Sequence, residues 1–431
     1  MNTISLSALT MSTEVTSEAD ECNICFVEFH GRDVTPVEDD PECKTHCGHL
    51  FHLKCLTRLF YGMPIGSRSC AYCRGKPFPV LNMKTGESYP DKFFPDKRFY
   101  DVCLHGDLNQ VTKSLAEGVY VDAVMKGDFN ALLIASTEGH TELAKVLINN
   151  GADVNAAMAE TGVTPLFFAA QNNHTDIVKL LINKGAKLDT PETKNGHTPL
   201  SVATQVGSID SVRFLLIAEA NPNVVLSSGH TLLSIAVQKG STDSVRLLLL
   251  AKADVNARNE DGATPLFFAA QKNLTEIAKL LINAGANLNT PRTSDGATPL
   301  ALAAQHGFTD FVKLLLDRGV NPNTALSNGV TPLYAAALKG RIDCVQLLLE
   351  KGPDLNARTK YGTTALFVAA EGGHTECLKR LIRAGADINA ALPDGTTPRS
   401  IATRMGHTDC VKVLIETEKS KEAKEKRDVL Q

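Results

Sequence analysis

Residues 164–183 read TPLFFAAQNNHTDIVKLLIN, and residues 264–283 repeat this sequence with few changes as TPLFFAAQKNLTEIAKLLIN. The opening Thr-Pro-Leu, intact or altered, also recurs along the chain every 33 or 34 residues. A period of this length indicates a stack of small units, because each unit is too small to bury its own apolar face. The triplets begin at Asn130, Thr164, Thr198, Thr231, Thr264, Thr298, Thr331, Thr364 and Thr397. Over a longer interval residues 164–263 match residues 264–363, which points to duplication of a three-repeat block.

Each repeat carries signals for two helices joined by a turn. The Thr can cap free amides at the start of the first helix, and Pro fits the first turn, where its missing N–H is no loss. Small alanines then let the two helices approach closely, and a Gly, often in a Gly-His pair, supplies a left-handed helix end. An LLL-type run predicts the second helix, and a segment such as GADVNA at residues 151–156 predicts the turn to the next repeat.

This pattern resembles the ankyrin repeat. The resemblance implies an α-solenoid of helix–turn–helix units plus β-turns, whose hairpin tips and first helices line a concave face used for protein binding. We assign residues 98–417 to the array, with about nine repeats after a degenerate cap at residues 98–125. The repeat containing Arg399 is an atypical last unit, and residues 418–431 are a charged tail. The array sequence has no nucleophile–base pair, phosphate loop or metal-ligand spacing, so we expect a binding surface.

The cysteines and several histidines of the array recur at fixed repeat positions, which favours structural roles. The cysteines occupy positions filled elsewhere by small or apolar residues, so we expect them in the core. The histidines recur in the turn between the two helices, where a structural contact is expected rather than catalysis. These residues are Cys103, Cys344, Cys377, Cys410, His140, His174, His374 and His407.

Four repeats carry an aromatic residue directly after the Thr-Pro-Leu triplet or its variant, where ankyrin repeats usually have His. Two interpretations stay open. The rings either pack between neighbouring repeats or form an aromatic stripe that contacts the substrate protein. The four residues are Phe167, Phe267, Tyr334 and Phe367.

The composition argues against two classes of partner. With 44 basic and 48 acidic residues, the net charge of −4 gives no field to attract nucleic acid or an anionic membrane. The first residues lack the basic and apolar regions of a signal peptide, and no later stretch approaches the ~20 apolar residues that span a bilayer. We expect a disordered N-terminus at residues 1–17 and a cytoplasmic or nuclear protein, or one in a host cytosol if it is a microbial effector.

Seven of the eleven cysteines lie between Cys22 and Cys73, a distribution that favours metal over disulfides. The segment contains a Cys-x2-Cys pair, a Cys-x-His-x2-His-x2-Cys run and a second Cys-x2-Cys pair. Zinc binds four such ligands in a tetrahedron, so eight ligands predict two closed Zn²⁺ sites. The predicted ligands are Cys22, Cys25, Cys47, His49, His52, Cys55, Cys70 and Cys73.

This spacing resembles the RING finger that has histidines in its fourth and fifth ligand positions, and we assign residues 18–80 to it. The resemblance implies interleaved sites: Cys22, Cys25, His52 and Cys55 hold one zinc ion, and Cys47, His49, Cys70 and Cys73 hold the other. A PHD-type finger fits less well, because it expects one His in another position and usually a Trp, which the chain lacks. A ligand set shifted to Cys43 and His46 breaks the remaining spacings.

Four positions beside the ligands bear on recruitment of a ubiquitin-conjugating enzyme. The resemblance implies that Ile24 contacts this enzyme and that Arg74 is the linchpin arginine, bridging it to ubiquitin, since a guanidinium can donate to two acceptors. Leu59 and Ala71 belong to the same contact surface, although many ligases have Trp and Pro there. Residues 74–97 contain four prolines and are expected to form a connector or a short β-containing extension, and we assign residues 81–97 as the linker.

Together the resemblances imply a RING-type E3 ubiquitin-protein ligase, an enzyme without a covalent intermediate of its own. The zinc domain recruits the ubiquitin-charged conjugating enzyme, and the array holds the substrate protein close to it. The alternative is a non-enzymatic ankyrin scaffold with a structural zinc domain. A zinc-dependent nucleic-acid binder would need a basic face, which the balanced charge does not provide.

Overall fold

The computed structural model describes residues 42–45, 50–61, 63, 68, 74, 77–86 and 88–429. The chain divides into two compact units, residues 1–187 and residues 188–431. Within the described residues, no helix has both the length and the apolar character needed to cross a membrane.

The first unit begins with a small antiparallel sheet whose strand order is β2-β1-β3-β4. The strands are β1 (Glu42–Lys44), β2 (Leu50–His52), β3 (Val80–Asn82) and β4 (Ser88–Tyr89). Helix α1 (Leu53–Tyr61) follows β2 directly. The sheet and α1 enclose an apolar cluster made of Cys43, Phe51, Leu53, Leu56, Phe60, Val80 and Phe94. Strand β3 crosses the boundary that we drew at residue 80, and β4 lies within the segment that we predicted to be a linker or a short β-containing extension.

One buried arginine, Arg68, which lies between α1 and β3 in the sequence, binds the residues that follow β4. The Arg68 guanidinium donates to the Asp91 carbonyl at 2.7 Å, to the Asp91 carboxylate at 2.9 Å and to the Pro95 carbonyl at 3.0 Å. Asp91 opens the short helix η2 (Asp91–Phe93). Burial lowers the pKa of Arg68, and the Asp91 carboxylate opposes that shift. The guanidinium remains charged, and the carbonyl and carboxylate oxygens that accept from it offset the cost of its burial.

Paired helices occupy the rest of the first unit. Its helices are α2 (Lys97–Leu104), α3 (Leu108–Ala116), η3 (Lys126–Asp128), α4 (Ala131–Glu138), α5 (Thr141–Asn149), α6 (Pro165–Gln171) and α7 (Thr175–Asn183). The pair α2 and α3 lies where we predicted a degenerate cap. At the start of α4 the side chain of Asn130 accepts from the Leu133 amide at 2.8 Å, and Thr164 accepts from the Phe167 amide at 3.2 Å. The predicted helix caps are therefore confirmed.

The second unit consists of seven further helix pairs. They are α8 (Pro199–Val206), α9 (Ile209–Ile217), α10 (Leu232–Lys239), α11 (Thr242–Leu250), α12 (Pro265–Gln271), α13 (Thr275–Asn283), α14 (Pro299–His306), α15 (Thr309–Asp317), α16 (Pro332–Leu338), α17 (Ile342–Leu349), α18 (Ala365–Glu371), α19 (Thr375–Arg383), α20 (Pro398–Met405) and α21 (Thr408–Val429). The described residues thus hold nine pairs after the cap, as predicted. The charged tail continues α21 as helix through residue 429.

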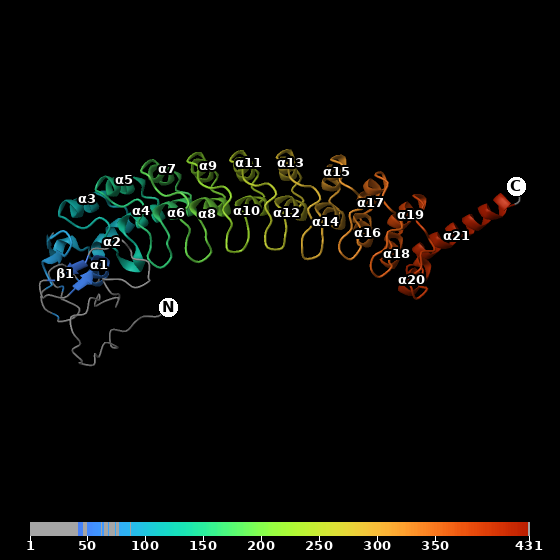
Figure 1. Cartoon of the computed structure of the whole chain (residues 1–431), viewed down its shortest axis with the longest axis horizontal. Coiled ribbons are helices and arrows are strands. Elements are labelled where there is room, and N and C mark those ends of the chain that lie inside the picture. Colours follow the sequence, from blue (N-terminus) through green and yellow to red (C-terminus); the bar gives the residue numbers. More distant parts are fainter. Residues whose placement is uncertain are drawn as a thin grey trace. The chain divides into compact units, whose positions relative to one another are not determined.

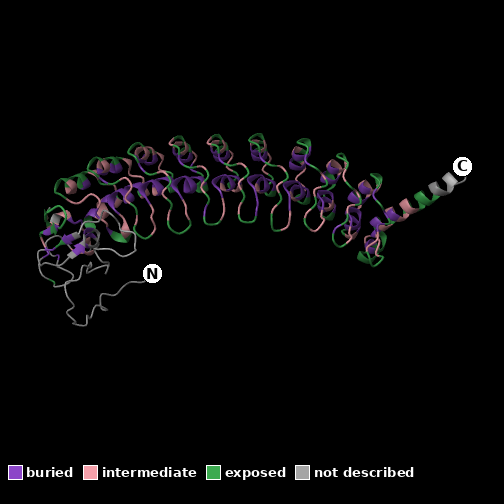
Figure 2. Ribbon diagram, in the orientation of Figure 1, coloured by how far each residue is buried: buried purple, intermediate pink, exposed green. Residues whose placement is uncertain are grey.

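Within the second unit the first helix of each pair lies in one row and the second helix in another, with a loop extending between successive pairs (Figure 1). The core lies where these rows face each other (Figure 2), and it includes Leu200, Leu215 and Val245 with no exposed surface. Hydrogen bonds also join successive loops. The Asn221 amide donates to the Asp189 carboxylate at 3.0 Å, and the Asp254 amide donates to Asn223 Oδ1 at 2.8 Å.

Candidate functional site

The predicted zinc ligands have side chains that lie outside the described residues. Of the eight, His52 and Cys55 are described by their backbone only, at the end of β2 and within α1. Among the residues that the structure does describe, no group of His, Cys, Asp or Glu could hold a metal ion. The two-zinc assignment therefore stays a prediction.

The residues predicted to recruit the conjugating enzyme are described in part. Ile24 and Ala71 lie outside the described residues. Arg74 is exposed and has a left-handed backbone with φ of 58°. Leu59 is half-buried and packs against the apolar cluster, so part of its side chain supports the fold. Cys43 is a fully buried member of that cluster, which favours a core role for it over the shifted ligand set.

The cysteines of the array are core residues, as their repeat positions predicted. Cys103, Cys344, Cys377 and Cys410 each expose 1% of their surface or less. Burial raises the pKa of the Cys103 thiol to about 12 and that of Cys377 to about 11. A thiol with so high a pKa is protonated at neutral pH, which does not suit a nucleophile.

The histidines of the inter-helix turns join neighbouring repeats. In the first unit His174 Nε2 lies 3.0 Å from the Thr137 carbonyl, and His140 Nε2 lies 2.9 Å from the Leu104 carbonyl. In the second unit His374 Nε2 lies 3.1 Å from the Leu338 carbonyl, and His407 makes the same contact to Glu371 at 2.9 Å. These bonds are the structural contacts expected for the turn.

The four aromatic residues differ in exposure. Phe167, Phe267 and Phe367 expose only 7%, 1% and 3% of their surface, which favours the packing interpretation at these positions. Tyr334 is half-buried, and its hydroxyl lies 3.0 Å from Thr363 Oγ1. Partner contact through these positions would therefore rest mainly on Tyr334.

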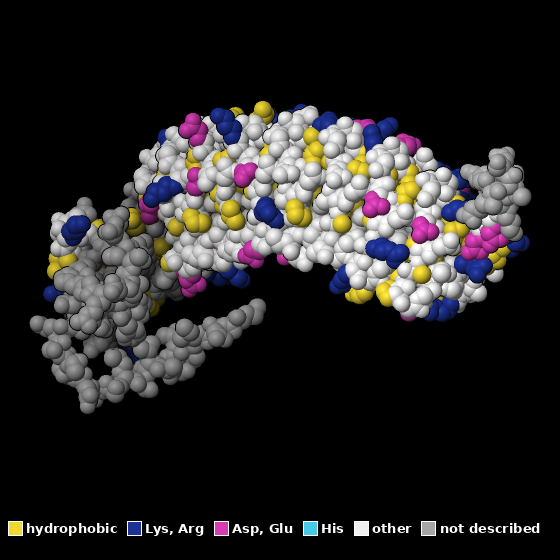
Figure 3. Space-filling view, turned by 45° about the vertical axis from the view of Figure 1, so that its right-hand side comes forward, with side chains coloured by type: hydrophobic (Ala, Val, Ile, Leu, Met, Phe, Trp, Pro, Cys, Tyr) yellow, Lys and Arg dark blue, Asp and Glu magenta, His cyan; other side chains and the backbone are white. Residues whose placement is uncertain are grey.

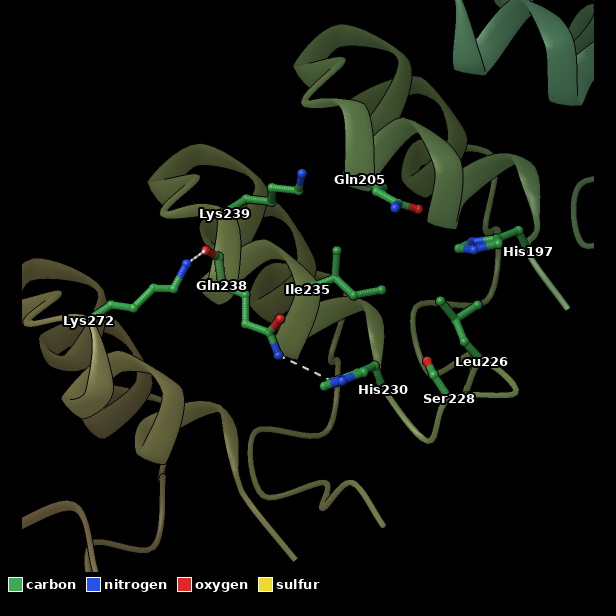
Figure 4. A pocket seen from close by; sticks show the side chains of 9 residues that line it. All are labelled: His197, Gln205, Leu226, Ser228, His230, Ile235, Gln238, Lys239 and Lys272. Carbon is green, nitrogen blue, oxygen red and sulfur yellow. Dashed lines mark hydrogen bonds between the residues drawn. The ribbon is translucent and has the colours of Figure 1, made fainter. Parts of the chain in front are cut away.

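Charged side chains of both signs are interspersed over the face of the described residues seen in Figure 3. Against this background the second unit holds two adjoining hollows between its loops and first helices. The histidine hollow has a volume of about 410 Å³ and is lined by His197, His230, Lys239 and Lys272 together with glutamine, serine and apolar side chains (Figure 4). No acidic residue lines it. The hollow therefore presents cationic groups and hydrogen-bond donors.

Hydrogen bonds hold the polar groups of the histidine hollow in place. The Gln238 side-chain amide lies 3.3 Å from His230 Nδ1, and the Lys272 ammonium lies 2.5 Å from the Gln238 carbonyl. His197 Nδ1 lies 3.1 Å from Ser201 Oγ, whose proton is donated to the Thr198 carbonyl at 2.9 Å. His197 Nδ1 therefore donates to Ser201.

The phenylalanine hollow adjoins the first, with which it shares His230, Gln238 and Lys272, and has a volume of about 460 Å³. The cation that lines only this hollow, Arg292, is already engaged. The Arg292 guanidinium lies over the Phe267 ring, 5.0 Å from the centroid, and donates to both Asp295 carboxylate oxygens at 3.1 and 2.6 Å. This pair lowers the pKa of Asp295 and raises that of Arg292. Free cationic groups are therefore concentrated in the histidine hollow.

Comparison with known families identifies the array. Residues 99–192, 132–226, 200–292, 233–326, 287–359 and 352–426 each match the family described as ankyrin repeats in three copies. The chain belongs to the ankyrin-repeat family. The matched segments begin at residue 99, so they do not extend over the zinc-type motif. No curated protein matches the sequence.

The sequence motifs of the ankyrin array did not identify His197 and His230, the two histidines of the hollow. His197 and His230 each stand directly before the capping Thr of their repeat, where the other repeats carry Phe129, Val163, Ala263, Ala297, Val330, Thr363 and Thr396. A comparison of repeats position by position would have found this signal, because His occurs there in two adjacent repeats. The histidines of the inter-helix turns were noticed because they recur at one repeat position. These two, in contrast, occur at a position where the other repeats have different residues.

Proposed function

We propose that this ankyrin-repeat protein is a RING-type E3 ubiquitin ligase. The observation that carries the proposal is the spacing of eight ligands from Cys22 to Cys73 with Arg74 directly after the last. Six thiols and two imidazoles form a donor set that Zn²⁺ binds well. The metal ions would supply folding free energy to a segment with a small core and would take no part in the reaction.

The ligase needs only proximity and orientation from this chain. Ile24 would contact the conjugating enzyme, and Arg74 would donate to that enzyme and to ubiquitin, so that the thioester is held in a reactive geometry. The ankyrin array would bind the substrate protein and raise the effective concentration of its lysines near the thioester. The exposed Arg74 side chain is compatible with this role.

The competing function is that of a protein-interaction scaffold with a structural zinc domain. It shares the ankyrin array with the proposal and differs only in having no effect on ubiquitin. A discharge assay separates the two, because a scaffold does not accelerate release of ubiquitin from a charged conjugating enzyme.

The test measures ubiquitin discharge to free lysine by the full chain, with a panel of conjugating enzymes. We expect close to two zinc ions per chain and faster discharge than without the protein. Arg74→Ala should keep both zinc ions and slow discharge by about ten- to hundredfold, since a charged hydrogen-bond donor is lost. Arg98→Ala, an exposed arginine on α2, is the control and should discharge as wild type does. Absence of discharge with every enzyme of the panel would favour the scaffold.

A further inference from the structure

The histidine hollow combines residues that two repeat positions supply. His197 and His230 stand before the capping Thr of adjacent repeats, and Lys239 and Lys272 stand eight residues after Thr231 and Thr264. All four line one hollow. At the position of the two lysines the other triplet repeats have Glu138, Asn172, Val206, His306, Lys339, Gly372 and Met405. In this stretch of the array, two imidazoles and two ammonium groups therefore converge on one hollow.

Several polar groups of the hollow are available to a ligand. Gln238 and Ser234 both contact His230 at Nδ1, at 3.3 and 3.5 Å, which leaves Nε2 as the ring nitrogen without a hydrogen bond to a described residue. The ammonium of Lys239 is exposed and forms no hydrogen bond or ion pair with any described residue. Lys272 uses one of its three protons for the Gln238 carbonyl and keeps two. These groups complement an anion.

We propose that the histidine hollow binds an Asp or Glu side chain of an extended peptide in the partner protein. The inference rests on the proposed function, since the ankyrin array is there the part that holds the substrate, and it adds the chemistry that selects the substrate. The carboxylate accepts from Lys239, from Lys272 and from His230 Nε2. Ile235 and Leu226 line the same hollow and provide an apolar contact for the methylene groups of the acidic side chain.

The surrounding charges favour a short acidic segment over a polyanion. The net charge of −4 opposes a long run of phosphates. The adjoining phenylalanine hollow contains Asp261, and Asp295 neutralises the arginine there. An anion larger than one or two side chains would therefore extend from cationic groups onto acidic ones. Phosphate groups also favour the paired donors of an arginine, and no arginine lines the histidine hollow.

The experiment uses the full chain and two fluorescein-labelled nonapeptides of Gly and Ser, one with three Glu and the other with three Gln at the same positions. Fluorescence anisotropy should show tighter binding of the Glu peptide by about tenfold, on the order of what two or three partly exposed charge contacts supply. Lys239→Gln combined with Lys272→Gln should remove this preference. Circular dichroism of the variant should match wild type, because both lysines are exposed.

The matched control is Lys339→Gln, since Lys339 occupies the same repeat position as Lys239 and does not line the hollow. It should retain the preference for Glu. Equal binding of the Glu and Gln peptides by wild type would overturn the proposal. An equal loss in the Lys339 variant, or displacement of the Glu peptide by a dT oligonucleotide at a lower concentration than by unlabelled Glu peptide, would also overturn it.

The discharge assay, carried out on the same proteins, tests the ligase proposal separately from the acidic-peptide site. The double lysine variant should discharge ubiquitin to free lysine as fast as wild type, because the hollow is not part of the zinc domain. Glu preference without any discharge would contradict the ligase and leave the hollow intact as an acidic-peptide site. Discharge without Glu preference would contradict the hollow and leave the ligase intact.

Discussion

A turn glycine that contacts the histidine of the next repeat can be tested by mutation, and an equivalent glycine elsewhere in the array serves as the control. Gly340 has a left-handed φ of 63°, and a Cβ added there would lie 2.6 Å from His374 Nδ1. Gly207 occupies the same repeat position with φ of 85°, and an added Cβ would have no atom within 4 Å. Ala at either position adopts an unfavourable backbone, while only Ala at position 340 also displaces an imidazole.

The expected losses of stability follow from the unfavourable backbone conformation and from the displacement of the imidazole. Gly207→Ala should cost about 1–2 kcal/mol for the left-handed backbone. Gly340→Ala should cost roughly 0.5–1.5 kcal/mol more, because the displaced ring loses its hydrogen bond to the Leu338 carbonyl at 3.1 Å. In a His374→Ala background that extra amount should disappear, since the methyl group then has room.

Amide hydrogen exchange of the full chain measures the effect locally, which is needed because a repeat array unfolds in parts. The opening free energy should fall in α16 and α17 for Gly340→Ala and in α8 and α9 for Gly207→Ala. If Gly340→Ala lowers it no more than Gly207→Ala does, the imidazole does not stabilise the turn. If the difference survives in the His374→Ala background, its cause is not the ring.

Two further predictions concern buried groups. Arg68→Ala should destabilise the sheet and the apolar cluster by about 3–5 kcal/mol, because it removes the buried cation that pairs with Asp91 and donates to the Pro95 carbonyl. Hydrogen exchange should rise in β3 but not in α16. Equal protection of β3 in Arg68→Ala and in the exposed control Arg98→Ala would contradict this. Iodoacetamide at pH 8 should leave Cys103 and Cys377 unmodified in the native chain and modify both in urea, since burial raises the pKa of these thiols to about 12 and about 11. The pKa of each thiol is higher in the folded chain than in the unfolded one, so the two protonated thiols stabilise the fold fully below about pH 8.5 and less as pH rises toward 11. The urea concentration at the midpoint of unfolding should therefore be lower at pH 10.5 than at pH 8.

The repeat period predicted the array well because its signals are local. Thr164 caps the helix that begins one residue later, and the glycine that ends a first helix is within nine residues of the cap. Long-range contacts could not be predicted in this way. Gly373 and His374 are neighbours in sequence, yet an added Cβ at Gly373 would contact His407 of the following repeat. The sequence identified the recurring Gly-His pair but carried no signal for the contact with the following repeat.

The boundary of the zinc-type domain shows the same limit. Residues 80–82 form a strand by pairing with β4 on one side and with β1, almost forty residues earlier, on the other, and three residues are too few for an alternating pattern to predict a strand. Arg68 likewise acquires its role from Asp91 and Pro95, which no local pattern joins to it. Proline content suggested a linker, whereas strand pairing places residues 80–82 and 88–89 in the sheet.

The duplicated block explains why the histidine hollow is restricted to one part of the array. If residues 164–263 and 264–363 derive from one ancestor, equivalent positions differ by 100. Core residues are kept: Leu200 and Leu300 are both fully buried. In the hollow, by contrast, His197 and His230 correspond to Ala297 and Val330, which have no titratable or hydrogen-bonding side chain. Packing requires the first pair to match, since a cavity or an overpacked core would destabilise both copies. Packing does not require His197 and His230 to match their equivalents, so the imidazoles are features of one copy alone, and the hollow forms where that copy meets Lys272 of the next.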